Sequence, residues 1–205
     1  MHDKLTLIEP LGDDALHQNA DAPSSCAVRD AAVLIPLVRH EGVWQVLFIR
    51  RARNERDRHS GQVAFPGGRL EESDATHEMA ALRETREEIG VHPDNIQLLG
   101  RIEPYITVSH YSVTPIVGIV DWPTSLKLQT SEVARAFLIP LSWLQDRQNF
   151  SFRARSDMDL QSARRHPIIV FSEYDGETLW GATARMTLNF LKSVEDGDIL
   201  LPGPT

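Results

Sequence analysis

Short apolar runs separated by polar turns dominate the first part of the chain, and this pattern predicts a β-sheet. Residues 28–38 form one apolar run and residues 44–50 a second, with a polar turn between them, so we expect a β-hairpin. Pro36 falls near the end of the first run, and because proline cannot donate to a ladder it indicates an edge strand or a bulge. Three later apolar runs predict further strands: 95–102, 113–120 and 167–171.

Two stretches repeat their apolar residues with the period of an amphipathic helix. One covers residues 179–191 and is expected to pack on the core, and the other ends at Gly90. In this second helix Met79, Leu82 and Ile89 share a face that can bury against the sheet. Gly90 stands where a glycine commonly terminates a helix, so we expect the helix to end there.

The helix that ends at Gly90 carries three glutamates on the side opposite its apolar face. Each residue of an α-helix turns by about 100°, so Glu84, Glu87 and Glu88 fall within one sector. Arg83 precedes Glu87 by four residues and is close enough to pair with it. Three crowded carboxylates repel each other unless a cation lies between them, and hard oxygen ligands suit Mg²⁺ or Mn²⁺. The alternative is a solvated acidic face, the usual meaning of a glutamate-rich run.

Composition and charge narrow the class of protein. The chain has 205 residues and a net charge of −8, which argues against general nucleic-acid binding but not against a nucleotide substrate. Cys26 is the only cysteine, which fits a reducing cytoplasm. The sequence has no apolar run long enough to cross a membrane, and its start does not resemble a signal peptide. We therefore expect a cytoplasmic protein without a membrane partner.

The chain divides into three expected parts. Residues 1–27 form an N-terminal extension, residues 28–194 a single domain, and residues 195–205 a flexible tail. Within the extension, the apolar residues of 5–8 can begin a short docked segment. Within the domain, residues 149–165 are polar and are expected to be irregular.

A basic segment precedes the acidic helix in this otherwise acidic chain. Arginine presents a planar fork that matches phosphate oxygens, so the segment predicts an anion site. It leads directly into Gly67 and Gly68, which permit close approach of the backbone to a ligand, and then into the acidic helix. The alternative is a solvated loop whose arginines offset nearby acids. The arginines of this segment are Arg50, Arg51, Arg53, Arg56 and Arg58.

Residues 68–91 resemble the signature of the Nudix hydrolases. The end of the signature, from Arg83 to Val91, is intact and reads Arg-Glu-x-x-Glu-Glu-x-Gly-x. The spacing from Asp74 to Arg83 is one residue longer than usual, and Thr85 occupies a position that is normally aliphatic. The resemblance implies an α/β protein with the Nudix fold, an α/β/α sandwich with a mixed β-sheet. It also implies metal-dependent hydrolysis of a diphosphate linked to a second group.

The segment 50–68 is similar to a motif of the coenzyme A pyrophosphatase branch of this family, in which an Arg-rich loop leads into Gly-Gln-Val-Ala-Phe-Pro-Gly-Gly. Arg51 matches the start of the motif, and either Arg56 or Arg58 can fill its second arginine position. That branch implies cleavage of coenzyme A, a small-molecule substrate, to 3′,5′-ADP and 4′-phosphopantetheine. One alternative is a Nudix pyrophosphatase acting on ADP-ribose, NADH or another nucleoside diphosphate derivative. Another is a Nudix-fold binding protein without catalysis.

The resemblance also implies roles for individual residues. The catalytic residues are Arg83, which orients an acid, and Glu84, Glu87 and Glu88. The ligands of Mg²⁺ or Mn²⁺ are the same three glutamates and the backbone carbonyl of Gly68. The substrate-binding residues are Arg50, Arg51, Arg56, Arg58, Gly67 and Gly68.

Three residues outside these motifs are weaker candidates for the same site. The family places a strand within residues 130–141 with an acid before it, so Glu132 is a candidate for a further ligand or a base. His110 and Tyr111 precede another expected strand and can line the substrate pocket. A homodimer is kept as one option for the assembly.

Overall fold

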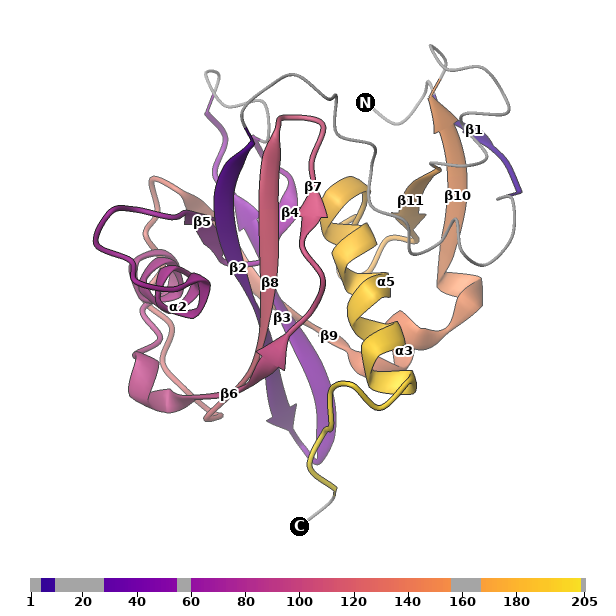
Figure 1. Cartoon of the computed structure of the whole chain (residues 1–205). Coiled ribbons are helices and arrows are strands. Elements are labelled where there is room, and N and C mark those ends of the chain that lie inside the picture. Colours follow the sequence, from indigo (N-terminus) through magenta and orange to yellow (C-terminus); the bar gives the residue numbers. More distant parts are fainter. Residues whose placement is uncertain (1–4, 10–27, 55–59, 156–166, 204–205) are drawn as a thin grey trace.

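The computed structural model describes residues 5–9, 28–54, 60–155 and 167–203, and it contains two β-sheets with helices on both faces of the larger one (Figure 1). The strands and helices expected from the apolar runs are confirmed, with shifts of a few residues at their ends. The elements are β1 (Leu5–Leu7), β2 (Arg29–His40), β3 (Val43–Arg51), β4 (Val63–Ala64), β5 (Gly67–Arg69), α2 (His77–Ile89), η2 (Pro93–Asn95), β6 (Ile96–Arg101), β7 (Tyr105–Ile106), β8 (Tyr111–Val120), β9 (Val133–Pro140), α3 (Leu141–Gln145), η3 (Arg147–Asn149), β10 (Phe150–Arg155), β11 (Ile168–Phe171) and α5 (Gly181–Glu195).

The larger sheet is mixed and is built around β2. Its strand order is β4-β3-β2-β8-β6, with β5 on β2, β7 on β8 and β9 on β3. β2 runs parallel to β8 and antiparallel to β3, and the turn between His40 and Val43 closes the expected hairpin. This arrangement is the expected α/β class with a mixed sheet.

β2 and β3 pair only near their common turn and then separate. Their pairing covers Leu37–His40 of β2, whereas β5 pairs with Ala31–Val33 further back on the same edge. β4 pairs in turn with the far end of β3. The segment 63–69 therefore fills the gap between the two strands, and this places the glycine pair in the middle of the sheet.

Pro36 lies at this gap. The N–H of Leu34 donates to the carbonyl of Pro66 at 2.8 Å. Because alternate residues of a strand face the same edge, the nitrogen of Pro36 also faces this edge. Neither β3 nor β5 pairs with β2 at Pro36, so the missing N–H of proline costs no ladder hydrogen bond there. On its other edge Pro36 stays in register with Gly118 of β8. The expectation of an edge strand or a bulge is wrong, because β2 lies inside the sheet and tolerates proline where β3 departs.

The two faces of the larger sheet are covered by different helices. Figure 1 shows α2 on one face and α5 on the other. Ala80 and Ala81 of α2 pack with Leu34, whereas Phe190 of α5 packs in the cluster that contains Ile35. Successive residues of β2 thus face opposite layers, as the strand period requires. Within the described ranges, no helix is long and apolar enough to cross a membrane.

The buried face of α2 differs from the expected one. Ile89 is fully buried as expected, but Met79 keeps 49% of its surface exposed, so the expectation that it buries against the sheet is wrong. The small residues Ala80 and Ala81 occupy the interface and are fully buried. Thr85 is buried as well, because its hydroxyl donates to the carbonyl of Ala81 at 2.7 Å and is thereby satisfied.

The smaller sheet has the order β1-β10-β11 and is antiparallel throughout. β1 pairs with β10, which confirms a docked segment near the start of the chain. The expectation that 149–165 is irregular is wrong for its first part, because Phe150–Arg155 forms β10. Its apolar residues alternate with polar ones over too few positions to stand out in the sequence.

Candidate active site

The glycine pair of β5 lies between the backbone of β2 and the carboxylates of α2. The N–H of Gly67 donates to Oε2 of Glu88 at 2.9 Å. A Cβ at Gly67, where φ is +152°, would lie 2.5 Å from the Cα of Val33, and a Cβ at Gly68 would lie 2.5 Å from Cδ of Glu84. The backbone of β2 therefore requires glycine at position 67, whereas a side chain at position 68 would displace the carboxylate of Glu84.

The three glutamates of α2 are not equally placed. The exposed fraction of the side chain is 17% for Glu84, 59% for Glu87 and 3% for Glu88. Glu84 and Glu88 are one helical turn apart and face the glycines of β5, whereas Glu87 lies at the edge of the helix toward solvent. The sector expected to carry three acids thus divides into an inner pair and an outer member.

The inner carboxylates carry poorly compensated negative charge. Burial raises the pKa of Glu88 to about 7, with the N–H of Gly67 and the guanidinium of Arg51 opposing the rise. Burial also raises the pKa of Glu84. The charge of Glu132 adds to both shifts. The charge of Glu87 also raises the pKa of Glu84, and the charge of Glu84 raises that of Glu88. A cation between these acids would offset the cost of keeping them ionised.

Arg83 holds the outer side of this group together. Its guanidinium donates to Asp74 Oδ2 at 2.9 Å, to Glu84 Oε1 at 3.0 Å and to Glu87 Oε2 at 3.2 Å. It also donates to the backbone carbonyl of Arg69 at 3.1 Å, which ties α2 to β5. The expected pairing with Glu87 is confirmed. A second link to the adjacent Glu84 restricts that carboxylate as well.

The role of Asp74 was missed from the sequence. Its side chain is only 4% exposed and accepts from both Nε and Nη2 of Arg83, which holds its pKa below the ordinary value. Asp74 precedes the helix by a turn of backbone that ends at the N-cap Thr76, whose hydroxyl accepts from the N–H of Met79. The spacing from Asp74 to Arg83 follows no helical period. In the sequence, this acid was therefore indicated only by its place in the signature that residues 68–91 resemble.

The arginines of the basic segment do not all face the candidate site. Arg50 and Arg51 are consecutive in β3, and consecutive side chains of a strand face opposite sides. Nη1 of Arg51 lies 4.0 Å from Oε1 of Glu88, whereas Nη1 of Arg50 lies 3.2 Å from Oε1 of the buried Glu177. Arg51 is therefore the member of the pair that reaches the candidate site. Two further substrate-binding candidates, Arg56 and Arg58, lie outside the described residues.

Glu132 brings a further acid toward the inner pair. It stands directly before β9, which confirms the expected strand, and its backbone carbonyl accepts from the N–H of Ala52 at 2.7 Å. Its negative charge raises the pKa of both Glu84 and Glu88. The side chain of Glu132 is exposed, and this distinguishes it from the buried Glu88.

The chemistry of these residues fits a hard divalent cation. In the part of the chain that the structure describes, no group of three or more His, Cys, Asp and Glu side chains encloses a metal position as it stands. The donors near β5 are nevertheless all oxygens, Glu88 is buried, and both inner glutamates have raised pKa values. Bringing Mg²⁺ or Mn²⁺ between Glu84 and Glu88 would balance their charge, so the residues suit such an ion.

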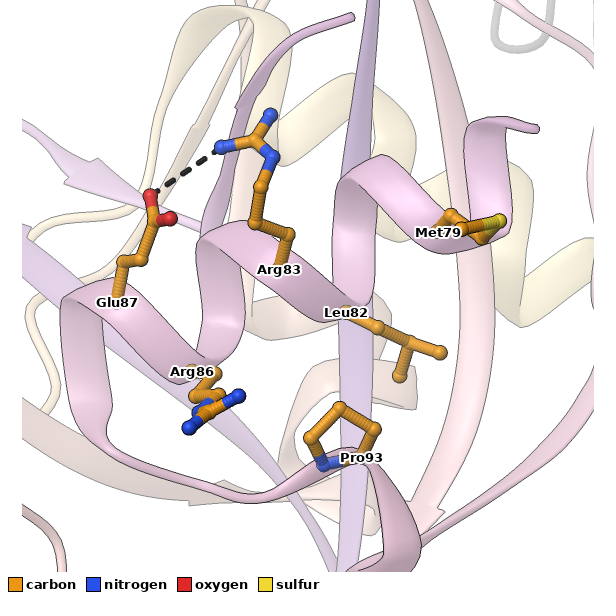
Figure 2. Close-up of a pocket in the computed structure, with 6 residues that line it drawn as sticks. All are labelled: Met79, Leu82, Arg83, Arg86, Glu87 and Pro93. Carbon is orange, nitrogen blue, oxygen red and sulfur yellow. Dashed lines mark hydrogen bonds and ion pairs between the residues drawn. The ribbon is translucent and has the colours of Figure 1, made fainter. Parts of the chain in front are cut away.

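A separate hollow of about 650 Å³ lies along the outer side of α2 (Figure 2). Arg83 and Glu87, joined by their ion pair, form one side of it. Met79, which was expected to face the sheet, contributes to its wall. The inner pair Glu84 and Glu88 does not line this hollow. The residues that line it are Met79, Leu82, Arg83, Arg86, Glu87 and Pro93.

The residues before β8 bring another polar group to the end of the sheet. His110 has a φ of +60°, and its buried Nδ1 has no hydrogen-bond partner within the described ranges. The following residue, Tyr111, packs against the core with its ring beneath two guanidinium groups, those of Arg29 and Arg69. These two arginines were not singled out from the sequence. That His110 and Tyr111 line a substrate pocket stays a prediction.

Comparison with known proteins shows relatives across most of the chain. Residues 28–158 match the NUDIX domain family. The Nudix hydrolase NudL of Pectobacterium atrosepticum, itself named as uncharacterised, is 33% identical over 168 residues, covering 82% of this chain and 84% of that protein. NudL of an Enterobacter species is 37% identical over 156 residues, covering 76% and 78%.

Solved structures show the same fold at low sequence identity. RenU, a Nudix hydrolase from M. smegmatis, superposes with a TM-score of 0.56 at 17% identity, covering 85% of this chain and 90% of that chain. A MutT protein from Methanosarcina mazei superposes with a TM-score of 0.51 at 18% identity, covering 83% and 99%. These two structures are similar to this chain in fold alone.

Proposed function

The chain belongs to the Nudix hydrolase family, and from that premise we propose that it is a coenzyme A pyrophosphatase. The proposed reaction adds water across the diphosphate: one P–O bond of the anhydride breaks and one P–O bond to the water oxygen forms. The products are 3′,5′-ADP and 4′-phosphopantetheine. The observation that carries the proposal is the position of Arg51, the first residue of the motif similar to that branch, 4.0 Å from Glu88.

The residues around β5 have distinct roles in this proposal. Bound Mg²⁺ or Mn²⁺ would shield the phosphate charge and acidify the attacking water. Glu84 and Glu88 would hold the cation, with Glu87 and the carbonyl of Gly68 as further ligands. Arg83 orients Glu84 through its 3.0 Å hydrogen bond, so that carboxylate is placed before substrate arrives. Arg51 would receive the oxygens of the diphosphate.

Glu132 is our candidate for the general base. A carboxylate that coordinates a metal is a poor base, so a base is best sought beside the ligands rather than among them. Glu132 is exposed, and its charge acts on both inner glutamates. An acid in that place can accept a proton from water and release it to solvent.

The test is turnover of a substrate panel by the purified full chain with Mg²⁺ and with Mn²⁺. We expect coenzyme A and its thioesters to be cut, with 3′,5′-ADP detected as product by chromatography. The panel also contains 3′-dephospho-coenzyme A, ADP-ribose and NADH. Coenzyme A left intact while ADP-ribose or NADH is hydrolysed would overturn the proposal in favour of the other nucleoside diphosphate substrates.

Metal binding has its own readout, independent of turnover. We expect Mg²⁺ or Mn²⁺ to raise the melting temperature of the wild-type chain, because a ligand at 100 times its Kd stabilises by about 2.7 kcal/mol. Glu84→Gln should lose most of this shift. An unchanged shift in that variant would contradict the assignment of the ligand. Metal-dependent binding of coenzyme A without any turnover would instead support a binding protein.

The location and assembly of the enzyme are part of the proposal. The single cysteine, Cys26, suits a reducing compartment, and we place the activity in the cytoplasm. A homodimer stays a prediction, and the elution volume of the full chain with light scattering decides it.

A further inference from the structure

Two arginines lie over one tyrosine ring at the end of the larger sheet. The Cζ atom of Arg29 is 4.4 Å and that of Arg69 is 5.3 Å from the centre of the Tyr111 ring. Three strands bring them together, because Arg29 pairs with Tyr111 between β2 and β8, and Arg69 of β5 pairs with Ala31 of β2. We call Arg29, Tyr111 and Arg69 the arginine clamp.

The clamp and the inner carboxylates lie on opposite faces of β5. Gly68 faces Glu84 of α2, so the next residue, Arg69, faces the other layer of the molecule. Its pairing partner Ala31 belongs to the core cluster beneath α5, and the ring of Tyr111 packs against the same cluster. Gly68 thus faces the acids of α2, whereas the adjacent Arg69 belongs to the arginine clamp on the opposite face.

The two guanidinium groups of the clamp are like charges that contact the same ring. Because they share one ring, they lie within about 10 Å of each other, roughly the Debye length at 0.1 M salt. Among the residues that the structure describes, neither forms an ion pair with a carboxylate, in contrast to Arg51 and Arg83. A guanidinium over a ring keeps the N–H groups at its edge available to phosphate oxygens.

The ring that carries the two arginines is held by its own loop. The N–H of Tyr111 donates to Oγ1 of Thr107 at 3.1 Å, and its carbonyl accepts from the N–H of Thr107 at 2.8 Å. The N–H of Arg29 donates to the carbonyl of His110 at 3.0 Å, which joins this loop to β2. These hydrogen bonds fix the backbone from which the Arg29 and Tyr111 side chains project.

We propose that the arginine clamp binds a second phosphate group of the substrate, separate from the diphosphate that is cut. The inference rests on the proposed function, in which the substrate carries a phosphate monoester at the ribose 3′ position. Two arginine forks around one anion give several charge-assisted hydrogen bonds, which a substrate without that phosphate cannot form. The clamp is thus a specificity determinant, and it assigns the 3′-phosphate to Arg29 and Arg69 rather than to the basic segment 50–58.

The test compares coenzyme A with 3′-dephospho-coenzyme A, which share the same diphosphate bond. We expect the wild-type chain to prefer coenzyme A, and Arg29→Ala and Arg69→Ala each to lower the ratio of the two kcat/KM values about tenfold or more, mainly through the KM for coenzyme A. Tyr111→Leu should lower the ratio as well, whereas Tyr111→Phe keeps the ring and should preserve it. Calorimetric binding of 3′,5′-ADP and of AMP to the metal-free chain should show the same dependence.

Arg39→Ala is the matched control. Arg39 lies at the other end of β2 and is also over an aromatic ring, that of Trp44, so the variant removes the same kind of contact away from the site. We expect its ratio to equal that of the wild type. Melting temperatures of all variants exclude unfolding as the cause of a lower ratio.

The outcomes separate this inference from the proposed function. No turnover of coenzyme A by the wild-type chain overturns the proposed function, and the inference with it. A wild-type preference for coenzyme A that survives in the clamp variants overturns the inference alone. A preference lost only when Arg56 and Arg58 are both replaced by alanine likewise overturns it, and assigns the 3′-phosphate to the basic segment.

Discussion

Gly67 and Gly68 are neighbours in one strand but have different steric surroundings. A Cβ at Gly67 would press on the backbone of β2, which cannot move without opening the sheet, and its φ of +152° is unfavourable for other residues. A Cβ at Gly68 would press on the carboxylate of Glu84, the end of a flexible side chain. The first glycine therefore serves the fold and the second serves the site.

This contrast gives a prediction for two alanine variants. Gly67→Ala should lower the free energy of unfolding by about 1–3 kcal/mol, as overpacking does. Gly68→Ala should keep its stability but lose about 10–100-fold in kcat/KM, because Glu84 is displaced from its position. Urea denaturation and steady-state kinetics on both variants check this, and equal effects of the two on stability would contradict it.

Glu88 should make the metal-free protein less stable at higher pH. Its pKa is about 7 in the folded chain against an ordinary value of 4.5, so between these values the folded state holds a proton that the unfolded state releases. Stability is then lost as the pH rises through this window, by up to about 3 kcal/mol if the shift is fully expressed. Urea denaturation in EDTA from pH 5 to pH 8 measures it.

Glu88→Gln is the variant that isolates this effect. A neutral amide cannot titrate, and its carbonyl oxygen can still accept from the N–H of Gly67, so the variant should gain stability over the wild type as the pH rises. Parallel pH profiles for the two proteins would show that the buried carboxylate is not responsible. Metal-dependent activity of the variant should fall, since a proposed ligand is lost.

At the scale of elements, specific residues fix where α2 begins and where it ends. Thr76 caps the first turn through the N–H of Met79, and Gly90 ends the helix in the left-handed conformation with a φ of +75°, as the sequence predicted. A side chain at Gly90 would press on Lys127, whose N–H donates to the carbonyl of Ile89. These ends set the rotation of the helix, which turns Glu84 and Glu88 toward β5.

Variants at Asp74 and Thr76 distinguish an effect on the candidate site from an effect on the stability of α2. Asp74→Ala removes the buried partner of Arg83 and should lower kcat/KM about tenfold or more, because the arginine no longer orients Glu84. Thr76→Ala removes only the cap and should cost about 1 kcal/mol of stability with normal kinetics. Kinetics and urea denaturation on both variants test this, and a kinetic loss in the cap variant equal to that in Asp74→Ala would argue against a positioning role.

At the scale of the whole molecule, Glu177 joins the hairpin after β11 to the larger sheet. Its buried carboxylate accepts a hydrogen bond from Arg135 of β9 at 3.2 Å and forms an ion pair with Arg50 of β3, also at 3.2 Å. Arg135 also pairs with Asp175 of the same hairpin. Because two arginines pair with one buried carboxylate, this contact links the smaller sheet to the edge that carries the basic segment.

Replacing this carboxylate should destabilise the whole chain rather than the site alone. We expect Glu177→Ala to lower the free energy of unfolding by about 1.5–3 kcal/mol, the usual worth of hydrogen bonds to charged groups. Asp175→Ala, which removes the more exposed acid of the same hairpin, is the matched control and should cost less. Chemical denaturation measures both, and a loss in the control as large as that in Glu177→Ala would contradict the central place of Glu177.

Much of the fold and part of the site were predictable because they depend on local patterns. The hairpin of β2 and β3, the two amphipathic helices and the helix end at Gly90 follow from the order of neighbouring residues. The pairing of Arg83 with Glu87 requires only the helical period. The exposure of Met79 was not predictable in this way, because β2 approaches α2 so closely that only small residues fit between them.

The sequence by itself thus determined the family, the acidic helix and the chemistry of its candidate ligands, since these lie within short spans of the chain. Only the tertiary structure decided that Glu84 and Glu88 face inward and that Arg50 and Arg51 serve different faces. It also brought together Arg29, Arg69 and Tyr111, residues far apart in sequence. The physical reason is strand register, which sets both the neighbours of a side chain and the face it occupies. For strands that are distant in sequence, such as β2 and β8, the pairing forms only in the folded chain.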